Sequence, residues 1–378
     1  MILNRPYPFI GANNIRLHPH SLVWDMRKWH DYNYWYCEIL LGTAFDTFPV
    51  DTVIPVDVLT KIKTDSTTFL VVCNIWEGFH SIVEPLYKSL VFENNIPPNK
   101  IILMNESADL HIAVREYASN NNVLPFNVEW LTSFQLHIRI DKQNTKPVNT
   151  LEIKHYPKKF LNFNRRWRMH RPSLVALLVA NDLLDLGYVS LGKTDDNNNW
   201  ESVYWWIENK FKSDAELHNL LEVNKDRIIN TPPLYLDTND LQTNHIPLDN
   251  DTDYLYENSY FSVITETNFY NEQEHGRFIS EKTFKPIAQK HPFIITTVPK
   301  TLELLRGIGY KTFHPWINEE YDNELDDVRR LKKIVNEIKR LANMSDSEVA
   351  EFILAVKPIA EHNFNVLMRN RIATVKTL

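Results

Sequence analysis

Glycine is scarce in this chain, and its scarcity excludes several kinds of nucleotide site. Only 8 of the 378 residues are glycine, and neither the GxGxxG nor the GxxxxGK pattern occurs. Those patterns wrap phosphate in backbone amides, in nicotinamide-dependent dehydrogenases and in P-loop enzymes respectively. If this chain binds phosphate, side chains must therefore supply the contacts.

Cysteine and long apolar runs are also rare. Cys37 and Cys73 form no CxxC pair and have no histidines grouped around them, which argues against a zinc site or a disulfide framework and predicts two reduced core thiols. No apolar run approaches the roughly 18 residues that a membrane helix needs, and no charged leader precedes a long apolar segment. We therefore expect no membrane insertion and a cytoplasmic location.

The charge balance argues against a nucleic-acid surface that works by bulk electrostatics, because the formal net charge is -7. A local basic cleft can still coexist with an acidic remainder. Hydrophobic residues make up 43% of the chain and aromatic residues 12%. The length and this composition predict two folded domains of about 150 to 200 residues each.

The first half, residues 1–150, shows alternating strand and helix patterns. The expected strands are 68–74, 100–104 and 127–131, and the expected helices are 77–93 and 109–119. Apolar strands that alternate with helices are typical of repeated βαβ units around a parallel sheet, so we predict a Rossmann-like domain. Residues 140–158 are polar and contain Pro147 and Pro157, as expected of a connection between halves.

The second half, residues 151–378, restarts the same pattern and ends in helices. Pro172 is expected to open a helix that runs to Leu186, with Gly187 as its stop. Ser345 and Glu348 form a capping box that opens a helix ending at Pro358, and a last helix follows towards Leu378. The other expected elements are strands 159–164, 188–191, 260–265 and 293–297, an irregular region 193–253, and a helix 325–344. The predicted fold class is α/β, with two Rossmann-like domains and a helical C-terminus.

Four arginines lie within seven residues, between an expected strand and an expected helix start. They are Arg165, Arg166, Arg168 and Arg171. At a helix N-terminus, guanidinium groups and free backbone N–H groups converge on an anion, and a pyrophosphate fits this arrangement. The alternative is an exposed loop or a set of ion pairs between the domains.

Glu281 and Lys282 occupy a similar position before a second expected helix. Lys282 can neutralise a phosphate, and Glu281 can accept hydrogen bonds from ribose or sugar hydroxyls. The alternative is an exposed helix start, where the helix dipole favours an acidic residue. Pro286 falls only a few residues later, so we expect the helix to start beyond it or to be kinked there.

Three segments of the second half resemble the donor-binding segment of the α-1,3-fucosyltransferases. They are residues 260–268 (YFSVITETN), 277–287 (RFISEKTFKPI) and 291–295 (HPFII). In that family an apolar strand ends in a Phe-Glu-Asn-Ser motif, a Tyr-Val-Thr-Glu-Lys motif opens a helix, and a proline-led strand follows. The chain also resembles glycosyltransferase-like proteins of tailed phages and other large DNA viruses, which would place it in the host cytoplasm.

The resemblance implies a GT-B glycosyltransferase whose C-terminal half binds a nucleotide-sugar donor. It implies that Glu281 and Lys282 contact the donor, that Glu266 and Glu281 orient the donor sugar and ribose, and that an arginine of 165–171 binds the diphosphate. Asn268 lies one place after the family's asparagine, and Thr267 stands at that asparagine's position, so the sugar and the base stay open. We expect no metal and no cofactor beyond the donor as co-substrate.

An inverting transfer needs a base near the acceptor hydroxyl, and we expect it at a strand end of the first half. Glu77 is the candidate, with Glu38 or Glu106 behind it, although a glutamate in such a position is more often a surface carboxylate or a helix cap. Trp76, Phe79 and His80 would form a wall for the sugar or part of the core. The acceptor is expected to be a hydroxyl of a glycan, a glycoprotein or a modified DNA base.

Three other functions remain open from the sequence. Asp249, Asp251 and Asp253 have the spacing of a metal-dependent GT-A transferase or of calcium ligands, but no glycine falls at the sixth position and Tyr260 occupies the twelfth, which favours a solvated turn. A transferase that modifies DNA would carry a basic groove and bind DNA in a salt-sensitive way. A non-catalytic module would bind an anionic glycan or nucleotide without turning it over.

Overall fold

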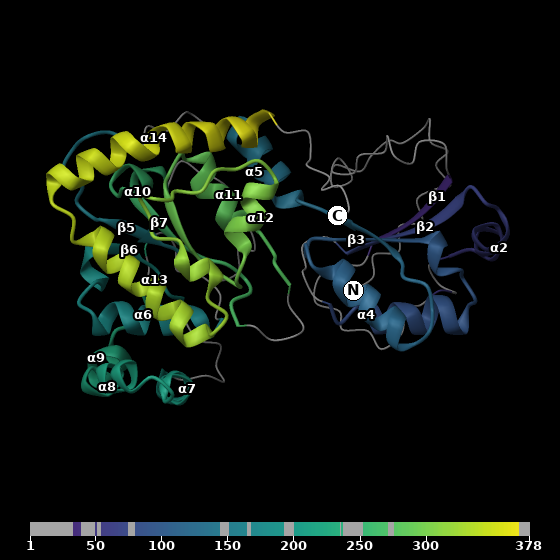
Figure 1. Ribbon diagram of the computed structural model, residues 1–378, viewed down its shortest axis with the longest axis horizontal. Coiled ribbons are helices and arrows are strands. Elements are labelled where there is room, and N and C mark those ends of the chain that lie inside the picture. Colours follow the sequence, from purple (N-terminus) through teal and green to yellow (C-terminus); the bar gives the residue numbers. More distant parts are fainter. Residues whose placement is uncertain are drawn as a thin grey trace. The chain divides into compact units, whose positions relative to one another are not determined.

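The computed structural model describes residues 33–38, 50, 54–74, 80–143, 151–164, 168–192, 200–234, 236, 252–270 and 276–369 (Figure 1). Contacts divide these residues into two compact units. The first holds the described residues up to Leu136 together with 276–279, and the second holds those from His137 onward apart from 276–279. The boundary was expected at residue 150, whereas the units meet between Leu136 and His137, and 276–279 belong to the first unit.

The first unit is built on four parallel strands. They lie in the order β1, β2, β3, β4, and every neighbouring pair is parallel. The strands are β1 (Asn33–Glu38), β2 (Thr68–Asn74), β3 (Ile101–Asn105) and β4 (Asn127–Trp130), and the helices are α2 (Val56–Thr64), α3 (Val83–Leu86), the π-helix η3 (Tyr87–Glu93), the 3-10 helix η4 (Pro98–Lys100), α4 (Leu110–Asn120) and the start of α5 (Ser133–Gln143).

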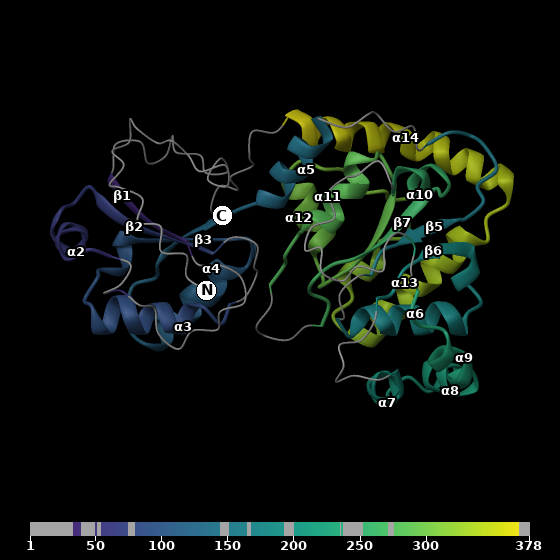
Figure 2. The same cartoon turned by 180° about the vertical axis from the view of Figure 1, so that it is seen from behind.

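Alternate residues of these strands form the core. Leu70 and Val72 of β2 belong to one apolar cluster with Ile101 and Leu103 of β3. The same cluster holds side chains of α2, α3, η3 and α4, and Figure 2 shows α3 and α4 on the same side of the strands. The residues between them, such as Val71 and Ile102, are also buried, as expected of a parallel sheet with two covered faces.

The second unit has a parallel sheet whose strands are out of chain order. The order is β6, β5, β7, β8, so β5 lies between the next strand of the chain and a much later one. Its strands are β5 (Phe160–Asn162), β6 (Gly187–Val189), β7 (Phe261–Thr265) and β8 (Phe293–Thr296). The prediction of an α/β fold with parallel sheets is confirmed.

Helices surround this second sheet. Figures 1 and 2 show α14 along one edge of the unit and α7, α8 and α9 at the opposite edge. They are α6 (His170–Ala180), η5 (Leu184–Leu186), α7 (Trp200–Phe211), α8 (Ala215–Val223), α9 (Lys225–Asn230), α10 (Asp253–Glu257), α11 (Glu281–Ala288), α12 (Thr301–Gly307), η7 (Glu320–Asn323), α13 (Asp327–Ala342) and α14 (Asp346–Arg369). No helix of the described residues is long and apolar enough to cross a membrane.

Gly187 was expected to stop a helix, and this prediction is wrong. Helix α6 ends at Ala180, and Gly187 is the first residue of β6. A Cβ atom at Gly187 would lie 2.4 Å from the ring of Phe160 in β5. Glycine is therefore needed there because the ring packs directly against the backbone of the neighbouring strand.

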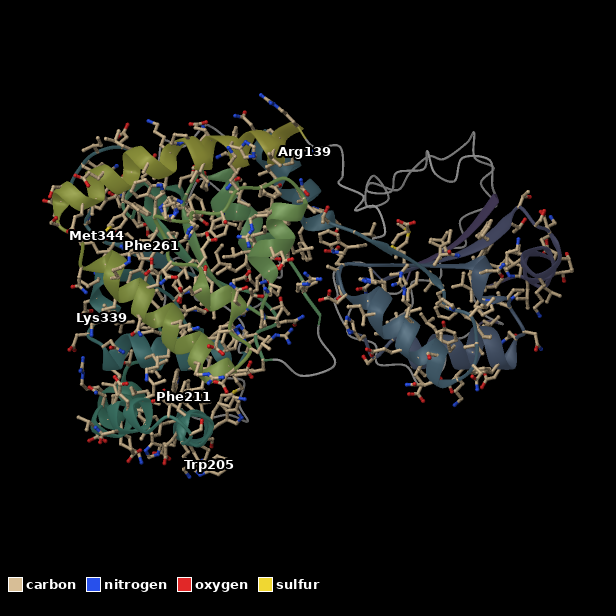
Figure 3. The ribbon with its side chains drawn as sticks, viewed as in Figure 1. Arg139, Trp205, Phe211, Phe261, Lys339 and Met344 are labelled. Atoms are coloured by element: carbon tan, nitrogen blue, oxygen red, sulfur yellow. The ribbon has the colours of Figure 1, made fainter. Side chains whose placement is uncertain are left out.

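Two further expectations from polar residues and proline are wrong. The region 193–253 was expected to be irregular, yet its described part contains α7, α8 and α9. On α7, Phe211 is 1% exposed and Trp205 is 64% exposed (Figure 3), so one face of the helix is buried and the other is exposed. Pro358 does not end a helix, because α14 continues through it. The bond lost at Pro358 is the one to the carbonyl of Leu354, an exposed residue, where the loss costs least.

Three further expectations concern the ends of helices, and one of them is confirmed in full. Ser345 and Glu348 form the expected capping box, with the Ser345 N–H 2.8 Å from Glu348 Oε2 and the Glu348 N–H 3.4 Å from Ser345 Oγ. Helix α11 starts before Pro286 and includes it, so the expectation of a later start is wrong. The region 140–158 was expected to be a connection, but α5 extends to Gln143.

Candidate functional site

The carboxyl ends of β5 and β7 form the switch point of the second sheet. The chain leaves β5 to form β6 on one side, while β7 pairs with β5 on the other side. The connections after these two strands therefore diverge, and open α/β sheets bind ligands at such a position. Asn162 and Asn164 tie the two ends together: Asn162 Nδ2 donates to the carbonyl of Val263 at 2.6 Å, and Thr265 Oγ1 donates to Asn164 Oδ1 at 2.5 Å.

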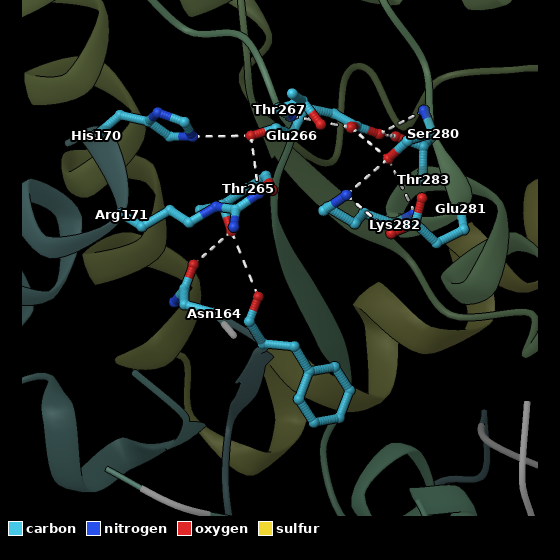
Figure 4. A network of polar contacts seen from close by, with 11 residues as sticks. Asn164, His170, Arg171, Thr265, Glu266, Thr267, Ser280, Glu281, Lys282 and Thr283 are labelled. Atoms are coloured by element: carbon cyan, nitrogen blue, oxygen red, sulfur yellow. Dashed lines mark hydrogen bonds and ion pairs between the residues drawn. The ribbon is translucent and has the colours of Figure 1, made fainter. Parts of the chain in front are cut away.

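Glu266 is the first residue after β7, and its carboxylate is fully buried (Figure 4). Oε1 accepts from the Ser280 N–H at 3.0 Å and from Thr283 Oγ1 at 2.5 Å. Oε2 accepts from Ser280 Oγ at 2.6 Å and from the Thr267 N–H at 3.2 Å. All of these partners donate, so the carboxylate is used to fix the start of α11 against the end of β7. Glu266 was predicted to orient the donor, and its geometry makes it a support for residues that could do so.

The start of α6 brings His170 and Arg171 to the same strand end. His170 Nε2 donates to the carbonyl of Glu266 at 2.8 Å, and Arg171 Nη2 lies 3.4 Å from the carbonyls of Thr265 and Glu266. Both side chains are buried, at 2% and 3% exposure. Pro172 is the third helical residue, in the first turn, where a missing N–H costs little.

Helix α11 brings Glu281 and Lys282 to this site from the other side of Glu266 (Figure 4). Ser280 is the N-cap, and its Oγ accepts from the Lys282 N–H at 3.3 Å. Lys282 Nζ donates to Glu281 Oε1 at 2.8 Å and to Ser280 Oγ at 3.1 Å. Burial opposes ionisation of Glu281, but the charges of Lys282 and Lys285 outweigh it and lower the pKa of Glu281 to about 2. Glu281 is therefore ionised at neutral pH.

Three cations act on His170. Burial, the guanidinium of Arg171, and the charges of Arg168 and Lys282 together hold the pKa of His170 well below its usual value, against the hydrogen bond to Glu266. His170 is therefore neutral at physiological pH. Arg168 lies in the loop before α6, Arg171 lies on α6 and Lys282 lies on α11, and the charges of all three act on His170. An anion bound near His170 would be attracted by all three charges.

The structure describes six of the nine predicted site residues. Glu77, Arg165 and Arg166 lie outside the described residues. Arg168 is exposed and Arg171 is buried. Asn268 is 5% exposed, and its carbonyl accepts from Thr297 Oγ1 at 3.1 Å. Four of the six lie together at the switch point: Arg171, Glu266, Glu281 and Lys282.

Of the three aspartates considered as metal ligands, the structure describes only Asp253, since Asp249 and Asp251 lie outside the described residues. Asp253 begins α10, and its Oδ1 accepts from Gln289 Nε2 at 2.6 Å. The buried Lys142 donates to the other end of the same amide at 2.9 Å. Among the residues that the structure describes, no group of three or more His, Cys, Asp or Glu side chains could hold a metal ion.

The secondary candidates of the first unit lie at strand ends. Glu38 is the last residue of β1, and Glu106 follows β3 and is 1% exposed. Ser133 Oγ donates to Glu106 Oε1, and Trp130 Nε1 donates to its carbonyl at 3.0 Å. His80 lies against Ser107, with its Nε2 atom 2.8 Å from Ser107 Oγ. Trp76 and Phe79 lie outside the described residues, and Cys73 is buried in β2.

Sequence reasoning missed His170, Ser280 and Thr283 as members of this site. His170 lies within the arginine-rich string, so its position beside a strand end was a usable signal. Ser280 was visible as an N-cap residue before an acidic helix start. Thr283 has no signal of its own, because its role depends on the position of Glu266, 17 residues earlier.

Comparison with known proteins gives only distant likenesses. No protein-family model and no curated protein sequence matches the chain. Among solved structures, the chain is similar to a UDP-forming α,α-trehalose-phosphate synthase from Burkholderia xenovorans, with 12% identity, 79% of this chain and 71% of that chain covered, and a TM-score of 0.36. A trehalose-6-phosphate synthase gives 8% identity, 82% and 72% coverage and a TM-score of 0.37. The N-terminal domain of a Candida albicans trehalose-6-phosphate phosphatase gives 10% identity, 82% and 72% coverage and a TM-score of 0.35. At these TM-scores the likeness does not establish a shared fold.

Two buried histidines of this unit predict that the protein loses stability in mild acid. Burial lowers the pKa of His291 to about 4, against a hydrogen bond to Ser259, and the pKa of His170 is also lowered. Below the ordinary histidine pKa of about 6.5, the unfolded chain takes up protons that the folded chain does not. The free energy of unfolding should therefore fall as the pH drops from about 6.5 to about 4.

His291→Gln tests this expectation, because glutamine cannot take up a proton. In the folded protein, His291 Nε2 donates to the carbonyl of Ser259 at 3.0 Å and Nδ1 accepts from Ser262 Oγ at 2.7 Å. Urea unfolding at several pH values should show a slope that is smaller by up to about 1.4 kcal/mol per pH unit, the value for one proton. An unchanged slope would contradict the assignment of His291 as a buried neutral residue.

Proposed function

We propose that this chain is a glycosyltransferase of the GT-B type that transfers a sugar from a nucleotide-diphosphate sugar to a hydroxyl acceptor. The observation that carries the proposal is that Arg171 and Lys282 lie on either side of Glu266 at the switch point of the second sheet, where the charge of Arg168 also acts on His170. Arg171 and Lys282 belong to the first turns of α6 and α11, whose dipoles also favour an anion. The second unit would hold the donor, and the first unit would supply the acceptor side.

The cations would act on the leaving group. In the transfer, the bond between the sugar's anomeric carbon and the diphosphate oxygen breaks, and a bond to the acceptor oxygen forms. The diphosphate leaves with the electron pair, and positive side chains aimed at it stabilise the charge that develops. The acceptor's proton would pass to a base of the first unit, for which Glu77 is the proposed residue.

The partly exposed residues of α11 are the proposed contacts to the donor. Glu281 is 33% exposed and Lys282 is 28% exposed, so both could reach a bound molecule. Glu281 would accept hydrogen bonds from sugar or ribose hydroxyls, while Glu266 would act through Ser280 and the start of α11. The donor sugar would be fucose or another hexose, the acceptor a glycan, a glycoprotein or a modified DNA base, and the reaction independent of metal.

Replacing Lys282 with alanine should weaken binding of the diphosphate by about 1.5 to 3 kcal/mol, the range for a hydrogen bond to a charged group. Isothermal titration of the preferred nucleoside diphosphate would measure the change. Lys311→Ala serves as a control, since Lys311 is an exposed lysine of the same unit. Equal affinity in a folded Lys282→Ala variant would remove this residue from the donor site.

A thermal-shift panel tests the function as a whole. The wild-type protein would be heated with GDP, UDP, ADP, CMP and dTDP and with their sugars, each with Mg²⁺ and with chelator. A selective rise in melting temperature for one diphosphate, unchanged by chelator, is the expected result, because a ligand that binds only the folded state stabilises it. A rise that disappears with chelator would favour the metal-dependent reaction, and no rise with any nucleotide would overturn the proposal.

A further inference from the structure

An aromatic side chain of the second unit, Tyr270, lies beside the candidate anion site and follows Glu266 by four residues. Its ring meets the ring of His170 edge to face, with the centroids 6.2 Å apart, and its Oη atom lies 3.5 Å from Ser173 Oγ on α6. The charges of three cations act on His170. Tyr270 is therefore next to these cations, on the α6 side of the strand end.

Helix α7 of the same unit brings a second ring and a further cation to Tyr270. The rings of Trp206 and Tyr270 meet at 69° with their centroids 5.4 Å apart. Lys210 Nζ lies 4.6 Å from the centroid of the Tyr270 ring and 3.5 Å from Asp327 Oδ2. Because Trp206 and Lys210 are four residues apart on the helix, they share one face of it. That face of α7 points to the strand end that carries the candidate site.

Packing of α7 does not by itself account for these two rings. The helix already has an apolar side that is buried in the unit, formed by Val203, Tyr204, Ile207 and Phe211. Trp206 and Tyr270 are instead only partly buried, so neither side chain is fully enclosed by protein. Two adjacent aromatic side chains that stay partly exposed next to a group of cations are a place where a ligand can add to the contact.

The chemistry of the two sides of Glu266 differs. On the α6 and α7 side, aromatic rings suit a flat base, because every nucleobase has a π face that stacks on aromatic side chains. On the α11 side, the carboxylate of Glu281 suits sugar hydroxyls, which donate hydrogen bonds to it. A molecule that joins a base to a sugar through a diphosphate therefore has a matching partner for each of its parts.

We propose that Trp206 and Tyr270 hold the base of the donor nucleotide, so that the nucleoside lies on the α6 and α7 side of Glu266 and the sugar lies on the α11 side. This inference rests on the proposed function of the site and gives the donor a direction. Glu281 then contacts the transferred sugar rather than the ribose. Helix α7 becomes part of the binding site, and the two rings determine how much the base adds to the affinity for the diphosphate.

Comparison of inorganic pyrophosphate with nucleoside diphosphates tests the proposal. The wild type should bind one of GDP, UDP, ADP and dTDP more tightly than pyrophosphate in isothermal titration. Trp206→Leu and Tyr270→Leu should each bind that nucleoside diphosphate about tenfold more weakly, because leucine is apolar but has no π face for stacking. Both variants should bind pyrophosphate as the wild type does, which also shows that the anion site is intact.

Two matched variants of α7 serve as controls. Trp205→Leu changes the neighbouring tryptophan, which is 64% exposed and does not share the face of Trp206, so it should change neither affinity. Trp206→Phe keeps an aromatic face and should retain most of the affinity for the nucleoside diphosphate. If Trp206→Leu weakened pyrophosphate as much as the nucleoside diphosphate, the ring would only support the anion site by packing, and the proposal would be wrong.

The direction of the donor has its own readout. The nucleoside diphosphate and its sugar form share the base, so Trp206→Leu should weaken the binding of both by the same factor. A loss confined to the sugar form would place the sugar on the rings and would overturn the proposed direction.

Failure of this inference can be told apart from failure of the proposed function. If the wild type and the leucine variants bind the nucleoside diphosphate equally well, the donor site stands and the role of the two rings falls. If the wild type binds neither pyrophosphate nor any of the four nucleoside diphosphates, the proposed function fails, and the base site fails with it.

Discussion

Replacing Glu266 with glutamine should lower the free energy of unfolding by about 3 to 5 kcal/mol, the range for removing one partner of a buried charged network. The change keeps the size and shape of the side chain. It places an amide NH₂ where Ser280 or Thr283 now donates to a carboxylate oxygen, so donor faces donor. The loss of the charge also weakens the remaining hydrogen bonds, since bonds to an ionised acceptor are about twice as strong.

Urea unfolding followed by circular dichroism would measure this loss. The control is Glu303→Gln on α12, because that carboxyl is 62% exposed and such a change is usually within about 0.5 kcal/mol of neutral. The variant should also bind the diphosphate more weakly, because Ser280 loses its anchor. A Glu266→Gln protein as stable as the control would show that the carboxylate does not hold α11 in place.

Replacing Arg330 with methionine should have an effect of similar size, a loss of about 3 to 5 kcal/mol. The Arg330 side chain is 1% exposed and lies on α13. Its Nη2 atom donates to the carbonyl of Phe269 and to Asp327 Oδ1, and its guanidinium lies 4.4 Å from the ring centroid of Phe269. Methionine fills part of the space but leaves the buried carbonyl of Phe269 without this donor and removes one of the cations that pair with Asp327, and that loss dominates.

The neighbouring Arg329 provides the control for this second experiment. Arg329 lies on the same helix but is 68% exposed and pairs with Glu324, so Arg329→Met should cost no more than about 1 kcal/mol. Thermal and urea unfolding of both variants would separate a buried cation from an exposed one. Because Phe269 follows Glu266 by three residues, Arg330→Met should also disturb the end of β7. Equal stability of the two variants would contradict this role of Arg330.

The strands were the most predictable part of the fold. Strand β2 has the predicted bounds of Thr68–Asn74, and β7 and β8 lie within one residue of their predicted ends. Each is a short apolar run bounded by polar residues, so burial of the whole run is enough to define it. Polar helices were the least predictable. Residues 200–230 lack a continuous apolar stripe, and α7 to α9 are defined by their contacts with α6 and with one another.

The order of the strands could not be predicted from local pattern. Strand β5 pairs with β7 through Phe160 and Phe261, about a hundred residues later in the chain, and no local signal selects that partner over another apolar strand. The switch point follows from this pairing. The sequence therefore offered the cations as candidates, while the approach of Arg171 and Lys282 to one strand end depends on the pairing.

The role of Glu266 shows why residue type alone was insufficient. Its expected role in orienting the donor was implied by the resemblance of residues 260–268 to a known family, in which the carboxylate is taken to face a ligand. In the folded chain, Ser280 and Thr283 fill its hydrogen-bonding positions. Lys282 and Glu281 remain partly exposed, because they lie on the outer side of the same helical turn.

The discontinuity of the first unit has a consequence for synthesis of the chain on the ribosome. Its sheet is complete once Trp130 has emerged, but Asp109 meets Arg277 only after the next 147 residues have been made, since 277 − 130 = 147. Until then the carboxylate of Asp109 has no Arg277 to pair with, and the backbone at Ser107 has no Phe278 to form its antiparallel bridge. The first unit thus reaches its final form only when most of the second unit already exists, so the two cannot mature strictly one after the other.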